Sequence, residues 1–431
     1  MPFMPFNILG MWFRGLLSIA ILAGGIYLLR QWYEDSHVVV HDPVADVNAR
    51  SDRGDVHPIQ GPGHRVFRWE PGWNRETREL VGGLALLTWA FAGQFVYGAV
   101  LSLMLPKGSS SGSAAGSKGN DQDEDPKSTR DGAVQRLRRP DGSEIQVECY
   151  GPPDAPPIVL THGWGVNSTE WYYVKKHLAD RFRVIVWDLP GLGLSRKPDN
   201  NDFRLEKLAA DLGAVLTATT GGRPAVIAGH SIGGMITLTF CRLFPEALGS
   251  RVAGIGLVHT TYTDPVKTTK GAAIYTAIET PVLVPLMYLT IALWPLVWLM
   301  NWMSYLNGSA HRSTHKQSFA GHETRGQLDF ATRFMPHARP DVLARGMLAM
   351  MKYDVTATLA TIPVPAAVFP GDLDTTCLPE ASQFMANSIP RAELLPLAPG
   401  RHMGLIEKHA EFDRALAGFA AARLLAGTAT G

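Results

Sequence analysis

The sequence predicts an α/β fold in which helices cover both faces of a mostly parallel β-sheet. From about residue 133, short apolar runs alternate with helical stretches. The runs are continuously apolar, as strands buried on both faces of a parallel sheet are. Two longer apolar stretches precede this region, and one long interval within it contains no strand pattern. These features add N-terminal transmembrane helices and a helical insertion to the expected architecture.

The expected sheet begins with a hairpin. Residues 133–138 and 144–149 are strand-like and flank the turn sequence of Pro140, Asp141 and Gly142. The expected parallel strands are residues 157–160, 184–187, 225–228, 252–258, 366–369 and 392–397. The expected helices between or after them are residues 168–179, 203–220, 232–244 and 404–423.

The first 106 residues are expected to form a membrane anchor with two transmembrane helices. Residues 8–29 are apolar apart from Arg14, and residues 80–105 carry no charge. Each stretch is long enough to cross a bilayer. A signal peptide is the alternative for the first stretch, although no small-residue cleavage site follows it. A buried core helix is the alternative for the second stretch.

The three regions after the anchor differ in composition. Residues 107–131 combine a Gly/Ser run with an acidic cluster and are expected to form a flexible linker. Residues 132–260 and 351–428 are expected to form the α/β core, and residues 261–350 a helical cap. Within the cap, residues 281–306 carry no charge and contain three prolines. We expect a buried helix pair there, with insertion into the bilayer interface as the alternative.

The composition narrows the classes of partner. The chain has 431 residues, is 46% hydrophobic and 18% charged, and carries a net charge of +1. No overall field therefore attracts nucleic acid. Its three cysteines are far apart and lack the spacing of a disulfide framework or a zinc site. They fit a reducing compartment, so we expect an integral protein of the cell membrane with its α/β core in the cytoplasm.

The segment Gly229-His230-Ser231-Ile232-Gly233 follows an expected strand and precedes an expected helix. A sharp strand-to-helix turn needs small residues on both sides and presents the central serine above the sheet. It also directs the Ile232 N–H, at the helix N-terminus, toward the reacting atoms. Ser231 is therefore the expected nucleophile.

A serine hydroxyl needs a base, and the base needs an orienting acid. His402 follows the last expected strand, and Asp374 follows the strand at residues 366–369. Their order along the chain is Ser, Asp, His, which is typical of this architecture. Asp264, after the strand at residues 252–258, is the alternative acid. His409 is the alternative base, although we expect it to face solvent.

A further loop follows the first parallel strand, at Thr161-His162-Gly163-Trp164-Gly165. The Trp164 N–H can join that of Ile232 in an oxyanion hole, where one such donor contributes about 2.7–4 kcal/mol to lowering the barrier. We expect His162 to brace this loop. Three further histidines, His311, His315 and His322, are too scattered for a metal site and are expected at the cap surface.

Residues 133–425 resemble the α/β-hydrolase superfamily, specifically its capped serine hydrolases. Five segments in the family's order carry the resemblance: HGWG at 162–165, DLPGLGLS at 188–195, GHSIGG at 229–234, GDLD at 371–374 and GRHMGLIE at 400–407. The resemblance implies an α/β-hydrolase fold and assigns Ser231 as nucleophile, His402 as base and Asp374 as acid. Arg401 before the histidine and the position of Pro379 after the acid depart from the family pattern.

Serine at position 231 favours acyl chemistry, since epoxide hydrolases and haloalkane dehalogenases of this superfamily have aspartate there. We therefore expect a cofactor-free and metal-free esterase or lipase-like enzyme acting on a small apolar ester or lipid. Carbon–carbon bond hydrolysis and acyl transfer use the same triad and are the enzymatic alternatives. A non-catalytic ligand-binding relative is the alternative from another class.

Overall fold

The computed structural model describes residues 7–43, 60–70, 72–101, 103 and 124–425. Its centre is an eight-stranded sheet in the order β10-β9-β8-β7-β5-β6-β4-β3. The strands are β3 (Ala133–Arg138), β4 (Glu144–Tyr150), β5 (Pro157–Thr161), β6 (Arg183–Trp187), β7 (Ala225–His230), β8 (Val252–Val258), β9 (Ala366–Phe369) and β10 (Ala392–Leu394). Strands β5 to β10 are parallel, and the β3–β4 hairpin adds the antiparallel edge. The predicted α/β fold is confirmed, although β10 is three residues shorter than expected.

Apolar side chains are buried on both faces of the sheet. In β5, Val159 belongs to one core cluster, while Ile158 and Leu160 belong to the other. Such two-sided burial is the reason that these strands are continuously apolar. The covering helices are α3 (Tyr172–Leu178), α4 (Leu205–Thr219), α5 (Ile232–Leu243), α12 (Thr356–Leu359), α13 (Pro379–Ser388), α14 (Gly404–Glu407) and α15 (His409–Leu424). Short 3-10 turns occupy Ser168–Trp171 and Pro245–Ala247.

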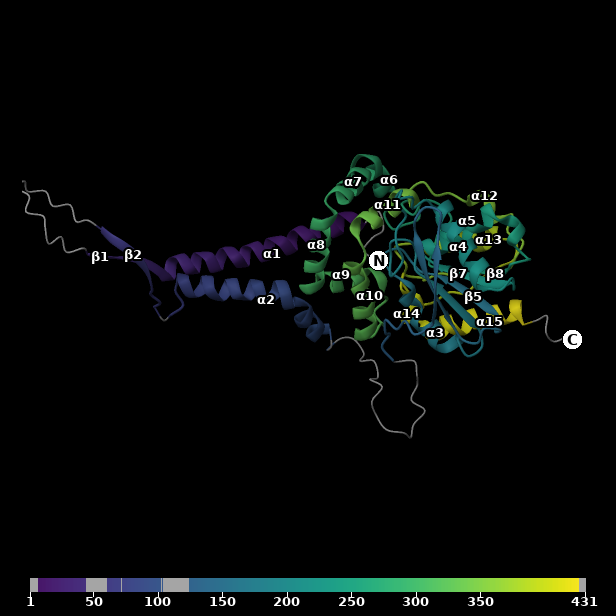
Figure 1. Cartoon of the computed structure of the whole chain (residues 1–431), viewed down its shortest axis with the longest axis horizontal. Coiled ribbons are helices and arrows are strands. Elements are labelled where there is room, and N and C mark those ends of the chain that lie inside the picture. The colour runs from purple at the N-terminus through teal and green to yellow at the C-terminus, as the bar shows by residue number, and fades with distance from the viewer. Residues whose placement is uncertain (1–6, 44–59, 71, 102, 104–123, 426–431) are drawn as a thin grey trace, which may run out of the picture.

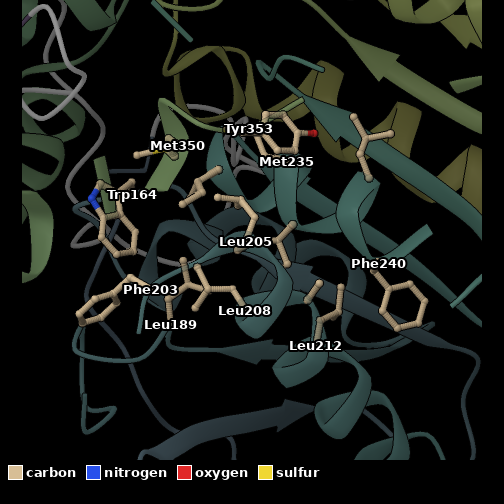
Figure 2. Packing of buried hydrophobic residues seen from close by; sticks show 14 of the residues in the cluster. Trp164, Leu189, Phe203, Leu205, Leu208, Leu212, Met235, Phe240, Met350 and Tyr353 are labelled. Carbon is tan, nitrogen blue, oxygen red and sulfur yellow. The ribbon is translucent and has the colours of Figure 1, made fainter. Parts of the chain in front are cut away.

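The first core cluster continues from the sheet to the loop after β5. Figure 2 shows Leu205, Leu208 and Leu212 of α4 in the same layer as Met235 and Phe240 of α5. Trp164 lies at one edge of this layer, with its ring edge-on to Phe203 at a centroid distance of 6.1 Å. The loop that carries Trp164 is therefore anchored by the core rather than exposed.

The segment between β8 and β9 is helical, in agreement with the sequence. It contains α6 (Ala272–Ile278), a π-helical turn (Glu279–Leu283), α7 (Val284–Ala292), α8 (Trp294–Leu306), α9 (Ser309–Ser318), α10 (Arg325–His337) and α11 (Pro340–Met350). Pro285 and Pro295 lie in the first turns of α7 and α8. A proline is tolerated there because the first N–H groups of a helix have no partner within it. These helices form the cap.

Two long helices project from the cap as a hairpin, α1 (Asn7–Ser36) and α2 (Arg75–Leu101) (Figure 1). A small antiparallel pair, β1 (His37–Pro43) and β2 (Gln60–Phe67), lies at the far end. Helix α1 extends beyond the predicted residues 8–29, and α2 begins before the predicted residue 80 and ends at Leu101. Three segments of the described chain are long and apolar enough to cross a membrane: Ile8–Ser36, Arg75–Leu101 and Ala272–Ala292.

The predicted flexible linker differs from the structure at its C-terminal end. Residues 104–123 lie outside the described residues, but residues 124–131 contact the α/β core. Glu124 forms ion pairs with Lys127 and Lys176, and Arg130 pairs with Glu148 and Asp188. Residues 124–131 of the expected linker therefore lie against the core, because Glu124 and Arg130 have charge partners there that composition alone does not reveal.

Candidate active site

Ser231 occupies a strained turn between β7 and α5. Its φ of 54° and ψ of −119° lie in a backbone region that residues other than glycine rarely adopt. A Cβ atom at Gly229 would overlap the backbone of Gly233, and one at Gly233 would overlap the carbonyl of Thr161. The glycines on either side of Ser231 therefore allow the turn that places the serine at the carboxyl end of the sheet.

Three loops bring Ser231, His402 and Asp374 together. His402 Nε2 lies 3.1 Å from Ser231 Oγ, and His402 Nδ1 lies 2.8 Å from Asp374 Oδ2. The other carboxylate oxygen of Asp374 accepts hydrogen bonds from the N–H groups of Thr376 and Cys377. All three side chains are buried, and Ser231 is only 1% exposed. This arrangement forms a continuous chain of contacts from carboxylate to hydroxyl.

Burial and charge set the protonation states of this chain. Burial lowers the pKa of His402, and the nearby Asp374 carboxylate only partly opposes that effect. Burial by itself would raise the pKa of Asp374, but the His402 and His259 rings and the Thr376 N–H outweigh it and lower this pKa. His402 is therefore neutral near pH 7, with Nδ1–H donating to Asp374 and Nε2 able to accept the serine proton.

The other candidates from the sequence lie elsewhere. Asp264 is buried and accepts a hydrogen bond from the Val266 N–H, and burial raises its pKa to about 6. The expectation that His409 faces solvent is wrong. Its ring is buried and stacks on Tyr173 with centroids 3.6 Å apart, because α15 turns this residue toward α3. The structure thus places Asp374 beside His402.

Trp164 and Ile232 lie in the segments that follow the neighbouring strands β5 and β7. Ile232 is the first residue of α5, where backbone N–H groups lack partners within the helix. Trp164 is held by its indole Nε1, which donates to the Leu343 carbonyl at 3.0 Å. His162 Nδ1 donates to the Gly163 carbonyl, and its Nε2 accepts the Leu189 N–H. His162 therefore braces the loop that carries Trp164.

A buried pair that the sequence analysis did not single out connects these loops. Glu170 Oε1 lies 2.7 Å from His230 Nδ1, and Glu170 Oε2 accepts the Gly163 N–H. His230 Nε2 lies 2.9 Å from the His402 carbonyl. Burial opposes ionisation of Glu170, but the His230 ring and the Gly163 N–H outweigh it and lower its pKa. The partners of His230, the Glu170 carboxylate and the His402 carbonyl, are both hydrogen-bond acceptors.

Replacing Glu170 with alanine should destabilise the fold strongly. The change would leave His230 Nδ1 and the Gly163 N–H buried without this partner, and each such loss costs about 1–3 kcal/mol of unfolding free energy. The measurement is denaturant unfolding in detergent. The control is Asp199→Ala, which removes an ion pair between two largely exposed side chains, Arg196 and Asp199, and should cost less than about 1 kcal/mol. Equal effects of the two variants would contradict a stabilising role of the buried Glu170 hydrogen bonds.

The cap histidines differ in part from their expected surface positions. His311 is buried, and its Nε2 lies 3.3 Å from Asp329 Oδ1. His315 is half-buried beside Glu323, which raises the pKa of His315. Within the described part of the chain, no three His, Cys, Asp or Glu side chains are grouped to hold a metal ion.

The cap covers the candidate site. Gly346 of α11 lies directly against the Trp164 indole, so that a Cβ atom there would overlap the ring. A small cavity beside Trp164 is lined by Thr314 of α9, Phe334 of α10 and Met403. Helices α9, α10 and α11 of the cap therefore lie against the loop that carries Trp164.

Comparison with known proteins agrees with this architecture. Residues 156–274 match the family described as alpha/beta hydrolase fold. An esterase from Thermogutta terrifontis superposes with a TM-score of 0.54 at 21% identity, covering 68% of this chain and 99% of that one. The chain has the α/β-hydrolase fold. That solved structure supports the fold alone.

Several curated relatives of this chain are esterases by name. The pimeloyl-[acyl-carrier protein] methyl ester esterase of Chromobacterium violaceum is 28% identical over 63% of this chain and 96% of its own length. The enzyme of that name from Aeromonas hydrophila is 33% identical, over 25% of this chain and 40% of its own. The chain matches 40% or less of the length of the first four curated relatives. Over part of its length, the chain is thus similar to esterases.

Proposed function

We propose that this chain is a membrane-anchored serine hydrolase that cleaves carboxylic esters of apolar acyl groups. The observation that carries the proposal is the hydrogen-bonded chain from Asp374 through His402 to Ser231. Each member follows a different strand of the sheet, so the fold itself brings them together. The esterase names of the curated relatives support the same reaction class.

The proposed reaction begins when Ser231 Oγ attacks the ester carbonyl carbon and His402 Nε2 takes the serine proton. The backbone N–H groups of Trp164 and Ile232 stabilise the oxyanion of the tetrahedral intermediate. The alcohol then leaves with the proton from His402, and the acyl group remains on Ser231. Water, deprotonated by His402, releases the acid and restores the serine. Asp374 keeps the imidazole in the required tautomer throughout.

The proposed location is the cell membrane, with α1 and α2 as spans and the catalytic domain in the cytoplasm. The lengths and apolar surfaces of the two helices support this anchorage. Both the N-terminal end of α1 and the C-terminal end of α2 lie beside the cap, as expected of a hairpin that crosses the bilayer twice (Figure 1). The three cysteines are free and buried, which fits a reducing compartment.

Fluorophosphonate labelling of the full-length protein in membranes tests the proposal. The probe reacts covalently with activated serines, so wild type should be labelled, and the Ser231→Ala and His402→Ala variants should not. A screen of esters with increasing acyl length then defines the acyl preference. Products from a ring-fission diketone or from an added alcohol acceptor would instead indicate the carbon–carbon hydrolase or acyltransferase alternatives. An unlabelled but folded wild type would contradict the proposal.

The activity should fall as the medium becomes acidic. Only neutral His402 can accept the serine proton, and burial places its pKa below the ordinary 6.5. The value of kcat/KM for a soluble ester should therefore be constant between about pH 7 and about pH 8 and decline below a midpoint under about 6.5. A pH profile with a short-chain chromogenic ester measures this midpoint. An acidic limb centred above pH 7 would contradict a buried neutral base.

A further inference from the structure

The cap helices α7 and α8 bury polar together with apolar side chains and expose large apolar ones. Their polar residues Thr290, Asn301 and Ser304 are buried. Their large exposed side chains are apolar: Tyr288, Leu289, Leu296, Trp298 and Leu299. A helix on a water-facing surface buries its apolar face instead. Polar residues between helices with apolar residues outside are typical of helices that contact lipid.

The first part of α1 belongs to the same helical unit. Its residues Ile8, Met11, Gly15 and Ser18 form a buried stripe at helical spacing. The indole of Trp12 donates to Thr290 Oγ1 at 3.0 Å, and Ser18 Oγ lies 3.3 Å from Ser304 Oγ. Asn307, just after α8, donates to Ser18 Oγ at 2.7 Å. Side-chain hydrogen bonds thus join α1 to α7 and to the end of α8.

The opposite face of this α1 segment is apolar and uncovered. Phe13 is 69% exposed, and Leu16 and Leu17 are also exposed. These residues lie at the level of the cap contacts, between Met11 and Ser18. Where α1 contacts the cap, the exposed side chains of both α1 and α8 are therefore apolar.

The thickness of a bilayer determines how much of α1 it covers. The first charged residue after Arg14 is Arg30. A hydrocarbon core about 30 Å thick takes about 20 helical residues, so it extends from Arg30 back to about residue 10. Met300 of α8 lies against Gly15, which is inside this interval. If the two helices cross the bilayer, α8 must lie within it.

Helix α2 independently gives the same position for the bilayer surface. Its last charged residue is Glu79, and about 20 residues further lies Gly98. The side chain of Arg325, at the start of α10, contacts this position, whereas Asn307 contacts Gly93, which lies deeper. The bilayer surface calculated from α2 therefore separates the end of α8 from the first charged residue of α10. On α1, Arg14 lies near the same surface and donates to Ser313 of α9.

We infer that α8 inserts into the same lipid leaflet as the first half of α1, with α7 at its interface. The inference depends on the proposed membrane anchorage. It also identifies the substrate class as esters dissolved in that leaflet. Ile8 and Met11 of α1 line an apolar crevice together with Leu343 of α11, whose carbonyl holds the Trp164 indole. One helix, α11, thus separates this crevice from the proposed oxyanion loop.

Spin labelling of the full-length protein in phosphatidylcholine liposomes tests the inference. A nitroxide spin label attached to Leu299→Cys collides with oxygen, which concentrates in lipid, and with a nickel chelate, which stays in water. The ratio of the two collision rates therefore distinguishes a lipid from an aqueous environment. Leu299 is 51% exposed, so the substitution leaves the core unchanged. The lipid control is Ile26→Cys in the distal half of α1, and the aqueous control is Leu194→Cys, which are 55% and 53% exposed. The native cysteines are buried, and protein without an added cysteine gives the background.

The oxygen-to-nickel ratio at Leu299 should be severalfold higher than at Leu194 and close to that at Phe13→Cys. A ratio at Leu299 equal to that at Leu194, with a high ratio at Ile26, would overturn cap insertion while leaving the anchor intact. Low ratios at both Leu299 and Ile26 would overturn it together with the anchorage. Leu296→Cys, also exposed on α8, provides the same measurement if the first variant does not fold.

Discussion

Replacing Ser231 with alanine should abolish ester hydrolysis, with a loss in kcat of about 10⁶-fold. The substitution removes the hydroxyl that contacts His402 Nε2, so no acyl-enzyme can form at position 231. The side chain is buried, and the change deletes a single oxygen atom. Steady-state hydrolysis of a soluble chromogenic ester by purified full-length protein measures the effect. The residual rate, above that in water, would report binding and the oxyanion donors alone.

The control for this variant is Ser250→Ala. Ser250 is exposed, and its hydroxyl donates to the Glu246 carbonyl rather than to a residue of the proposed triad. Its kcat should equal that of wild type, and both variants should unfold at similar denaturant concentrations. A folded Ser231→Ala protein that still turns over the ester at a rate near wild type would show that another group is the nucleophile.

Much of the fold was predictable because its signals are local. Strands β5 to β9 are short apolar runs bounded by turns, and two-sided burial requires that pattern. The turn at Ser231 was equally readable, since close approach of the backbone demands glycine at positions 229 and 233. Both features depend on residues within a few positions of one another, and a single sequence contains that information.

Features that depend on distant residues were not predictable. Nothing near Glu170 in the chain indicates that it faces His230, sixty positions later. Likewise, the apolar stretch at residues 8–29 predicts a membrane span but does not show that Ser18 meets Ser304. Pro285 and Pro295 interrupt an apolar run in the sequence, whereas the structure places them in the first turns of helices. These outcomes require tertiary contacts that local propensity does not encode.

The choice between two acids illustrates this limit. Asp264 and Asp374 both follow strands at the carboxyl edge of the sheet, where such a fold collects its site residues. Only the conformation of the intervening loops decides which carboxylate reaches the histidine. The structure places Asp374 Oδ2 at 2.8 Å from His402 Nδ1, whereas Asp264 accepts the N–H of Val266, two residues away.

Asp374→Asn should therefore lower kcat by about 10⁴-fold, while Asp264→Asn should leave it within about tenfold of wild type. An asparagine at 374 can donate to Nδ1, which favours the tautomer with hydrogen on Nε2 and prevents that nitrogen from accepting the serine proton. An asparagine at 264 keeps an oxygen that can accept the Val266 N–H. Hydrolysis of the same soluble ester by the two variants measures both effects.

The pH profile separates loss of the acid from simple unfolding. The Asp374 carboxylate raises the pKa of His402, so its removal should move the acidic limb of the residual activity to lower pH. A partly unfolded protein would lose activity at every pH without such a shift. If Asp264→Asn instead shows the large loss, the acid is Asp264 and the contact between His402 and Asp374 is structural. If neither variant changes kcat, the proposed triad does not carry the reaction.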